Sequence, residues 1–351
     1  MTCIQDKAML ASLNISQWTA RKMDKGASQT TAETYHAEAS EISTYKSTIQ
    51  KKHLDKIQKI VGKARTMHYK FTTPYTFSKG QAILATAMLP DYMAEGSKLI
   101  REFDAAVSDF MAVYADVRNE AKGSLGDLYN DFDYPSEQQL RRKFSMSYDF
   151  APIPKGSHLQ ISISEDELVE MQKEIEEKVK DSMSIAMDEL WQRVYTVTNA
   201  LKERMTPQAG QDKTFRDTLI GNIAELADIL PKMNITGDAQ LDEVAADLRR
   251  DLAGYDPAAL RIDRGMRKEA AKRADAILDK VSHRAKAPAS MELPEAAPVA
   301  TPTATPEPKK IDVQAAQVSI EEVMAPKAPA KAAEPEEDDE NIKRLKAAGI
   351  I

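Results

Sequence analysis

A single apolar seam through the middle of the chain constrains its fold most, because it predicts one very long helix. Its members recur every three or four residues: Leu168, Met171, Ile175, Val179, Met183, Ala186, Leu190, Val194, Val197, Leu201 and Met205. Ten steps cover 37 residues, a mean step of 3.7, which is nearer to a straight α-helix than to the ~3.5 of a left-handed supercoil. Ser164 and Glu167 match a capping box at the start of the seam. The spacing therefore predicts a helix over residues 165–206 that packs in a bundle.

Weaker periodic patterns predict further helices on both sides of this seam. They cover residues 30–69, a short helix that reaches Pro90, about thirty residues from Asp91, residues 215–230 ended by Pro231, residues 241–252, and a last helix from Pro257 to near His283. Two runs that alternate with period two, 144–150 and 159–163, predict a β-hairpin, and residues 13–17 are a candidate third strand. The expected fold is mainly α: an elongated bundle of long helices with one small hairpin.

Composition divides the chain into three parts. Residues 1–29 form an N-terminal segment, 30–285 a helical body, and 286–351 a tail rich in Ala, Pro and acidic residues that is expected to be disordered. The single cysteine, Cys3, cannot form an internal disulfide. No apolar run reaches the length of a membrane span, so we expect a cytoplasmic protein without a membrane anchor.

The residues that usually carry catalysis or bind cofactors form no recognisable pattern. The five histidines are scattered, and no pair of His or Cys has the spacing of metal ligands. Glycine-rich phosphate-binding motifs are also missing from the sequence. We therefore expect no catalytic residue, no metal and no cofactor.

Residues 125–154 hold six of the 21 aromatic residues of the chain. The simpler interpretation is a core corner between helices and hairpin, because aromatic side chains bury large areas. Three acids alternate with these aromatics, however, which indicates that part of the segment is exposed. Ser136 with Gln139 is typical of a helix start and predicts two helical turns that direct Arg141 and Arg142 outward. The candidate partner-binding residues of this segment are Phe132, Tyr134, Arg141 and Arg142.

A lysine stripe follows the helix that is predicted over residues 30–69. Its members fall on one face: Lys52, Lys56, Lys59, Lys63 and Lys70. Such a stripe is typical of a surface that contacts phosphates, and binding of that kind weakens steeply with salt. The alternative is a solvated face, or one that pairs with the acidic start of the helix at 165.

The tail ends in an acidic run followed by a short apolar segment. That segment contains Ile342, Leu345, Ile350 and Ile351. An acidic spacer before an apolar terminus is suited to a tethered peptide that folds on a protein partner. A solubilising tail with a chance apolar end is the equal alternative.

Several strings together resemble a family of uncharacterised helical proteins of bacteriophages and proteobacterial mobile elements. They are LNISQWTARK, LYNDFDYPSEQQLRRKF with the PIP loop, WQRVY and LPKMNITGD, within residues 10–285. The family has no established activity, so the resemblance transfers no catalytic residue. It implies a phage protein in the host cytoplasm. It also implies a gene encoded near those of AAA+ ATPases of the MoxR type and von Willebrand A-domain proteins, which favours an adaptor.

Two functional hypotheses follow from these patterns. The first is a non-enzymatic helical scaffold or adaptor that binds a protein partner, an AAA+ ATPase system being the candidate, through its body and its tail. The second is a nucleic-acid-binding protein of phage replication or recombination that uses the lysine stripe. Self-association and a role in the virion are left open by the sequence.

Overall fold

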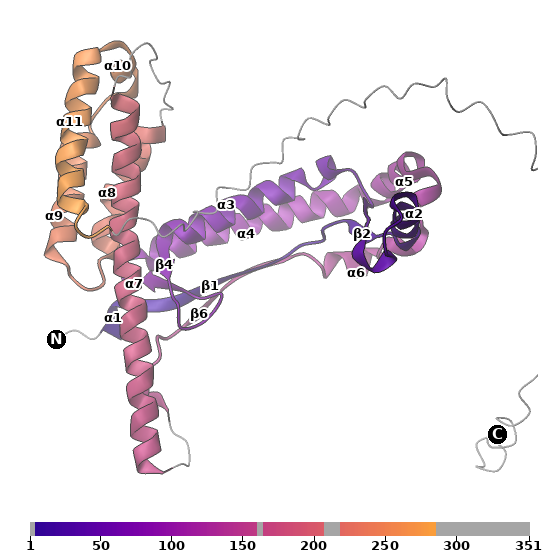
Figure 1. The fold of residues 1–351 in the computed structure, drawn as a ribbon, viewed down its shortest axis with the longest axis horizontal. Coiled ribbons are helices and arrows are strands. Elements are labelled where there is room, and N and C mark those ends of the chain that lie inside the picture. The colour runs from indigo at the N-terminus through magenta and orange to yellow at the C-terminus, as the bar shows by residue number, and fades with distance from the viewer. Residues whose placement is uncertain (1–3, 160–163, 207–217, 286–351) are drawn as a thin grey trace, which may run out of the picture. The chain divides into compact units, whose positions relative to one another are not determined.

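The computed structural model describes residues 4–159, 164–206 and 218–285, and it is mainly helical with a small antiparallel sheet (Figure 1). These residues all belong to one compact unit, residues 1–298. The predicted tail, 286–351, and residues 160–163 of the second strand of the predicted hairpin, 159–163, lie outside the described residues.

The larger sheet has the strand order β4-β5-β1-β6, and all its pairs are antiparallel. Its strands are β1 (Ala8–Ser16), β4 (Thr72–Pro74), β5 (Ala82–Ala85) and β6 (Ser145–Ala151). The predicted strand near residue 13 is confirmed, since Leu13 faces Tyr148 and Ile15 faces Met146 in the register of β1 and β6. The first half of the expected hairpin is therefore a strand that pairs with the N-terminal strand β1.

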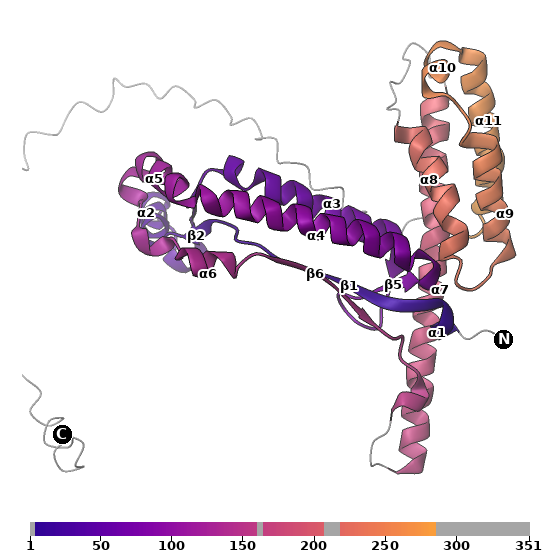
Figure 2. The same ribbon diagram turned by 180° about the vertical axis from the view of Figure 1, so that it is seen from behind.

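Two helices pack against each other and against this sheet. They are α3 (Asp55–Phe71) and α4 (Leu89–Ala112), which run side by side in both ribbon views (Figures 1 and 2). Tyr92 and Phe103 of α4 are completely buried here, and Ile57 of α3 is nearly so. Burial of such large side chains is the main source of stability for this part of the core.

The predicted long helix is confirmed as α7 (Glu165–Met205), with the capping box of Ser164 and Glu167 at its start. Arg193 joins α7 to the end of α3, because its guanidinium donates to the carbonyl oxygens of Lys70 (3.3 Å) and Thr72 (2.7 Å). From Val179 onward every seam residue except Val197 is buried, and Figure 2 shows α8 (Thr218–Met233) and α11 (Arg264–Val281) beside the upper half of α7. The other C-terminal helices are α9 (Ala239–Asp247) and α10 (Pro257–Ile262), with a π-helical segment at Leu248–Leu252.

The prediction of one helix over residues 30–69 is wrong. Helix α2 (Lys25–Tyr35) ends at His36, which adopts a left-handed φ of 53° and donates its N–H to carbonyls of the last turn. The chain then forms β3 (Tyr45–Ser47), which pairs with β2 (Arg21–Met23), before α3 begins. The apolar residues between α2 and α3 have helical spacing, but the pairing of β3 with β2 holds that part of the chain extended.

Two smaller predictions are also wrong. The short helix expected before Pro90 is the strand β5 followed by a 3-10 turn, because all four residues of β5 are buried between β4 and β1. Pro231 does not end α8, which continues to Met233. A proline in the last turn removes a single helical hydrogen bond, and Met233 is buried, so packing favours the extra residues.

The helix from Asp91 is present but is interrupted at Val113, after which α5 (Tyr114–Leu125) continues.

Candidate functional site

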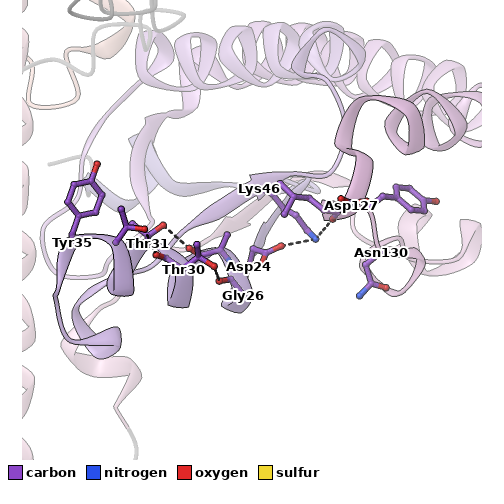
Figure 3. A pocket seen from close by; sticks show the side chains of 12 residues that line it. Asp24, Gly26, Thr30, Thr31, Tyr35, Lys46, Asp127 and Asn130 are labelled. Atoms are coloured by element: carbon purple, nitrogen blue, oxygen red, sulfur yellow. Dashed lines mark hydrogen bonds and ion pairs between the residues drawn. The ribbon is translucent and has the colours of Figure 1, made fainter. Parts of the chain in front are cut away.

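Lys46 joins three segments that lie far apart in the sequence. Its ammonium nitrogen lies 3.0 Å from a carboxylate oxygen of Asp24 and 3.0 Å from one of Asp133. It also donates a hydrogen bond to the carbonyl oxygen of Leu128 (Figure 3). The start of α2, the strand β3 and residues 126–134 thus meet at one cation, and we call these segments together the Lys46 corner.

The local sequence positions each member of this ion triad. Asp24 is the N-cap of α2 and accepts a hydrogen bond from the N–H of Ala27 at 2.9 Å. This hydrogen bond, followed by the one from Lys46, lowers the pKa of Asp24. Burial alone would lower the pKa of Lys46, but hydrogen bonds to Asp133 and Asp24 outweigh it and raise that pKa. Asp24 and Lys46 are therefore both charged at neutral pH, and their ion pair holds the start of α2 to β3.

An open cleft of about 720 Å³ lies on the Lys46 corner. Most of its lining residues carry a polar group: Asp24, Gly26, Ala27, Thr30, Thr31, Thr34, Tyr35, Lys46, Asp127, Leu128, Tyr129 and Asn130. Figure 3 shows that α2 supplies one side and that Asp127 and Asn130 come from the facing segment. The lining offers hydrogen-bonding groups and two tyrosine rings, which suits contact with a polar peptide surface better than enclosure of a small ligand.

The threonine hydroxyls of the cleft are engaged with their own helix. Those of Thr30, Thr31 and Thr34 donate to the carbonyl oxygens four residues earlier, at 3.0, 2.7 and 2.7 Å. None of them is hydrogen bonded to a general base, which an activated nucleophile requires. Asp127 has no hydrogen bond or ion pair within the part of the chain that the structure describes, so it is available to a donor from outside.

Phe132 stands at the rim of this corner with 94% of its surface exposed. The turn that carries it is rigidly held, because the N–H of Phe132 donates to Oδ1 of Asn130 and the N–H groups of Asp133 and Tyr134 donate to carbonyls of the same turn. Asp131 in addition accepts hydrogen bonds from Arg118 (2.8 Å) and from the hydroxyl of Tyr129 (2.6 Å). An exposed phenylalanine on a fixed turn is preorganised for contact with a partner.

Tyr134, the second aromatic candidate, is placed differently. It is only 7% exposed, and its hydroxyl donates to the carbonyl oxygen of Thr48 at 2.6 Å. Burial raises its pKa to about 12, and the guanidinium of Arg118 lies over its ring. Tyr134 therefore supports the turn from inside, while Phe132 is the side chain that a partner can reach.

The short helix α6 (Glu137–Arg141) follows this turn. Its predicted capping box, Ser136 with Gln139, is confirmed. Arg141 and Arg142 at its end are exposed, as the sequence indicated. The apolar residues of the tail terminus, Ile342, Leu345, Ile350 and Ile351, lie outside the described residues.

The lysine stripe is largely paired with acids of neighbouring helices. Lys52 lies 2.7 Å from Glu120 of α5, Lys56 lies 2.6 Å from Asp109 of α4, and Lys63 lies 3.8 Å from Glu102 of α4. Lys70 pairs with Glu225 of α8, whereas Lys59 is exposed and has no ion pair within the described ranges. The acids at the start of α7, an expected partner of the stripe, do not contribute to these pairs. Because acids of α4, α5 and α8 compensate most of its positive charge, the stripe is less suited to binding phosphates.

The Lys46 corner was not predicted as a site from the sequence. Lys46 belongs to the same basic run as the stripe, and nothing local distinguishes it from its exposed neighbours. One signal was present, because Asp127, Asp131 and Asp133 alternate with aromatics and imply an exposed, charged turn. The partners of Lys46 are 22 and 87 residues away in the sequence, at Asp24 and Asp133, beyond the reach of a periodicity argument.

In the described ranges, no group of three or more His, Cys, Asp and Glu side chains could hold a metal ion. No helix among those residues is long and apolar enough to cross a membrane. Comparison with models of protein families, with curated proteins and with solved structures finds no match to this chain.

Proposed function

We propose that the chain is a non-enzymatic adaptor that binds a protein partner at the Lys46 corner, with Phe132 as the central contact. The observation that carries this proposal is the 94% exposure of Phe132 on a turn that side-chain and backbone hydrogen bonds hold fixed. A few residues carry most of the binding energy of a protein interface, and aromatic side chains are enriched at the interface core.

The surroundings of Phe132 support an interface rather than an isolated apolar residue. Exposed apolar side chains also occur on the segments that meet at Lys46 or directly beside them: Met23 just before α2, Tyr45 on β3, and Leu128 in the cleft. Tyr35, at the far end of α2, lines the same cleft and is 75% exposed. An aromatic centre surrounded by polar, hydrogen-bonding groups is the usual composition of a protein interface.

Arg141 and Arg142 extend the proposed contact beyond the turn. Both are exposed at the end of α6, and arginine is enriched at interfaces because its planar group donates several hydrogen bonds. In this proposal they contact acidic or carbonyl groups of the partner while Phe132 enters an apolar pocket.

Several parts of the adaptor hypothesis stay predictions. These are the elongated form of the bundle, the phage origin and host cytoplasm implied by the resemblance, an AAA+ ATPase as the partner, and a second contact through the tail terminus. The tail is tested by deleting residues 286–351, which is expected to leave the helicity of the body unchanged and to weaken retention of the partner.

The central experiment compares partner retention by the wild-type chain and the Phe132→Ala variant. Each is tagged, expressed in the organism that encodes it, purified by affinity and analysed by quantitative mass spectrometry. Tyr69→Ala is the matched control, because Tyr69 is an exposed aromatic on α3, away from the corner. A partner is accepted only when the purified protein binds the purified chain directly.

The expected result is a protein that the wild-type chain and Tyr69→Ala retain equally and that Phe132→Ala loses. With purified proteins we expect Phe132→Ala to weaken binding, with a dissociation constant at least about tenfold higher than that of the wild type. Equal binding by all three chains would remove the Lys46 corner from the function.

A further inference from the structure

The first turns of α7, from Glu165 to Lys178, differ from the rest of the helix. They hold seven acidic residues and two lysines, a net charge of −5 over fourteen residues. None of these fourteen residues is buried, whereas from Val179 onward buried residues recur along the helix. We call Glu165–Lys178 the acidic arm, and Figure 1 shows it continuing past the sheet.

The apolar seam of α7 continues along the acidic arm, and no helix among the described residues covers it there. Leu168, Met171 and Ile175 follow one another at spacings of three and four residues, so they lie on one side of the helix. Met171 is 41% exposed, and the other two are half-buried. Such a row is the face that an amphipathic helix normally buries against a neighbour.

One side of the arm is already occupied by the preceding segment of the chain. The 3-10 turn Gly156–His158 packs on α7 so closely that a Cβ on Gly156 would lie 2.6 Å from the carbonyl oxygen of Gln172. The amide of Gln172 also donates to the carbonyl oxygen of Leu159. This turn covers the arm beside Gln172 and leaves Met171 exposed.

The charges of the arm are only partly compensated. Lys173 pairs with Glu177 and Lys178 with Glu174, both within the helix. Asp166, Glu170 and Glu174 follow one another four residues apart, and like charges at that spacing repel one another and destabilise a helix. A cationic surface beside the arm would remove this repulsion.

We propose that the acidic arm docks a basic amphipathic helix of a partner protein, with its apolar row against Leu168, Met171 and Ile175 and its Lys or Arg side chains beside the glutamates. Charge complementarity selects this occupant. A second copy of the chain would bring two arms of net charge −5 together, in either orientation, and an acidic or neutral helix would leave the glutamates unpaired. This surface is separate from the Lys46 corner, and the proposal does not depend on the function proposed there.

The test uses a synthetic peptide of about 20 residues with Leu at every third or fourth position and Lys and Ala between them. Its affinity for the full-length chain is measured by fluorescence anisotropy at low and moderate salt. One control peptide has Glu in place of Lys, and another has the same composition in scrambled order. We expect the amphipathic basic peptide to bind at least about tenfold more tightly than the scrambled one, and the acidic peptide not to bind.

Variants of the chain locate the binding surface. Met171→Gln removes the exposed apolar contact, and Glu170→Lys with Glu174→Lys reverses charge on exposed positions, so each is expected to weaken binding at least about tenfold. Asp181→Lys with Asp188→Lys makes the same change of charge on exposed positions further along α7 and is expected to bind as the wild type does. Circular dichroism confirms that each variant is folded.

Three results would overturn the proposal. Equal affinity for the ordered and scrambled peptides would show that the arm attracts any cation. Equal loss in both charge-reversed variants would show that the overall charge of the chain is responsible. A dimer in sedimentation velocity that Met171→Gln dissociates would make a second copy the natural occupant.

Discussion

Nδ1 of His68 lies 2.7 Å from the hydroxyl oxygen of Tyr92, in the core between α3 and α4. Burial lowers the pKa of His68 to about 4, whereas a histidine in an unfolded chain titrates near about 6.5. The unfolded chain therefore takes up a proton below that pH that the folded chain does not. We expect His68 to reduce the free energy of unfolding by about 3 kcal/mol as the pH falls from about 6.5 to about 4, with no effect above this range.

The measurement is urea unfolding at several pH values between these limits. His68→Gln keeps a hydrogen-bonding group beside Tyr92 but does not titrate, so the difference in stability between wild type and variant should change with pH. Titration of carboxylates elsewhere changes the stability of both proteins equally, so its effect cancels in that difference. A constant difference would show that His68 is protonated in the folded chain.

Phe132 and Tyr134 are predicted to behave oppositely although they are two residues apart. Phe132→Ala should change the free energy of unfolding by less than about 0.5 kcal/mol, because almost nothing is buried there. Tyr134→Phe should cost about 1 kcal/mol through the lost hydrogen bond to Thr48, and Tyr134→Ala about 3–5 kcal/mol through the lost packing. Chemical denaturation of the three variants checks the order, and a destabilised Phe132→Ala would place that side chain in the core.

The contrast between these residues shows what the sequence could and could not predict. Capping boxes and long periodic seams depend on neighbours within a few residues, so α7 and the start of α6 were predicted correctly. The structure of residues 36–54 was not predicted correctly, because β3 is held in place by β2 and by the contacts of Lys46 with Asp24 and Asp133. The four buried residues of β5 were read as a helix for a related reason, since a short, fully apolar run carries no period.

The candidate site was predictable only in part. Alternating acids in the aromatic segment indicated an exposed edge, and Phe132 lies there, but the same argument could not tell that Tyr134 points inward to Thr48. Identifying the cleft required α2 and residues 126–130 to be brought together. That contact joins segments about a hundred positions apart, and only the fold determines it.

Lys46→Met is expected to destabilise the Lys46 corner more than an equivalent change on the surface. The substitution keeps the length of the side chain but leaves the carboxylates of Asp24 and Asp133 next to each other without a cation. Lys59→Met is the matched control, because Lys59 is exposed and unpaired within the described part of the chain. Thermal unfolding should give a clearly lower midpoint for Lys46→Met alone, and equal midpoints would mean that the triad contributes nothing to stability.

The lysine stripe gives a direct test of the nucleic-acid hypothesis. Because Lys52, Lys56 and Lys63 are paired with Glu120, Asp109 and Glu102, we expect no stable complex with duplex DNA in a gel shift at about 150 mM salt. Replacing Lys52, Lys56, Lys59 and Lys63 by Gln should then change nothing. Tight binding by the wild type that this variant loses would instead support the nucleic-acid function.

Gly156 and Gly62 are predicted to respond to alanine with opposite signs. A Cβ on Gly156 would lie 2.6 Å from the carbonyl oxygen of Gln172, so Gly156→Ala must push the turn away from α7. Gly62 lies in the middle of α3, is exposed, and has no atom within 4 Å of an added Cβ. Gly62→Ala should therefore stabilise the chain by about 0.5–1 kcal/mol, since alanine is the better helix former.

Two measurements separate these effects. Urea denaturation should give a lower free energy of unfolding for Gly156→Ala and a higher one for Gly62→Ala. Limited proteolysis should cut Gly156→Ala faster within residues 153–159, because the turn that this substitution displaces is held to α7 by that contact and by the hydrogen bond from Gln172 to Leu159. If Gly156→Ala were as stable and as resistant as the wild type, the close packing of this turn on the acidic arm would be wrong, and the face of α7 left open to a partner would be larger than the one proposed.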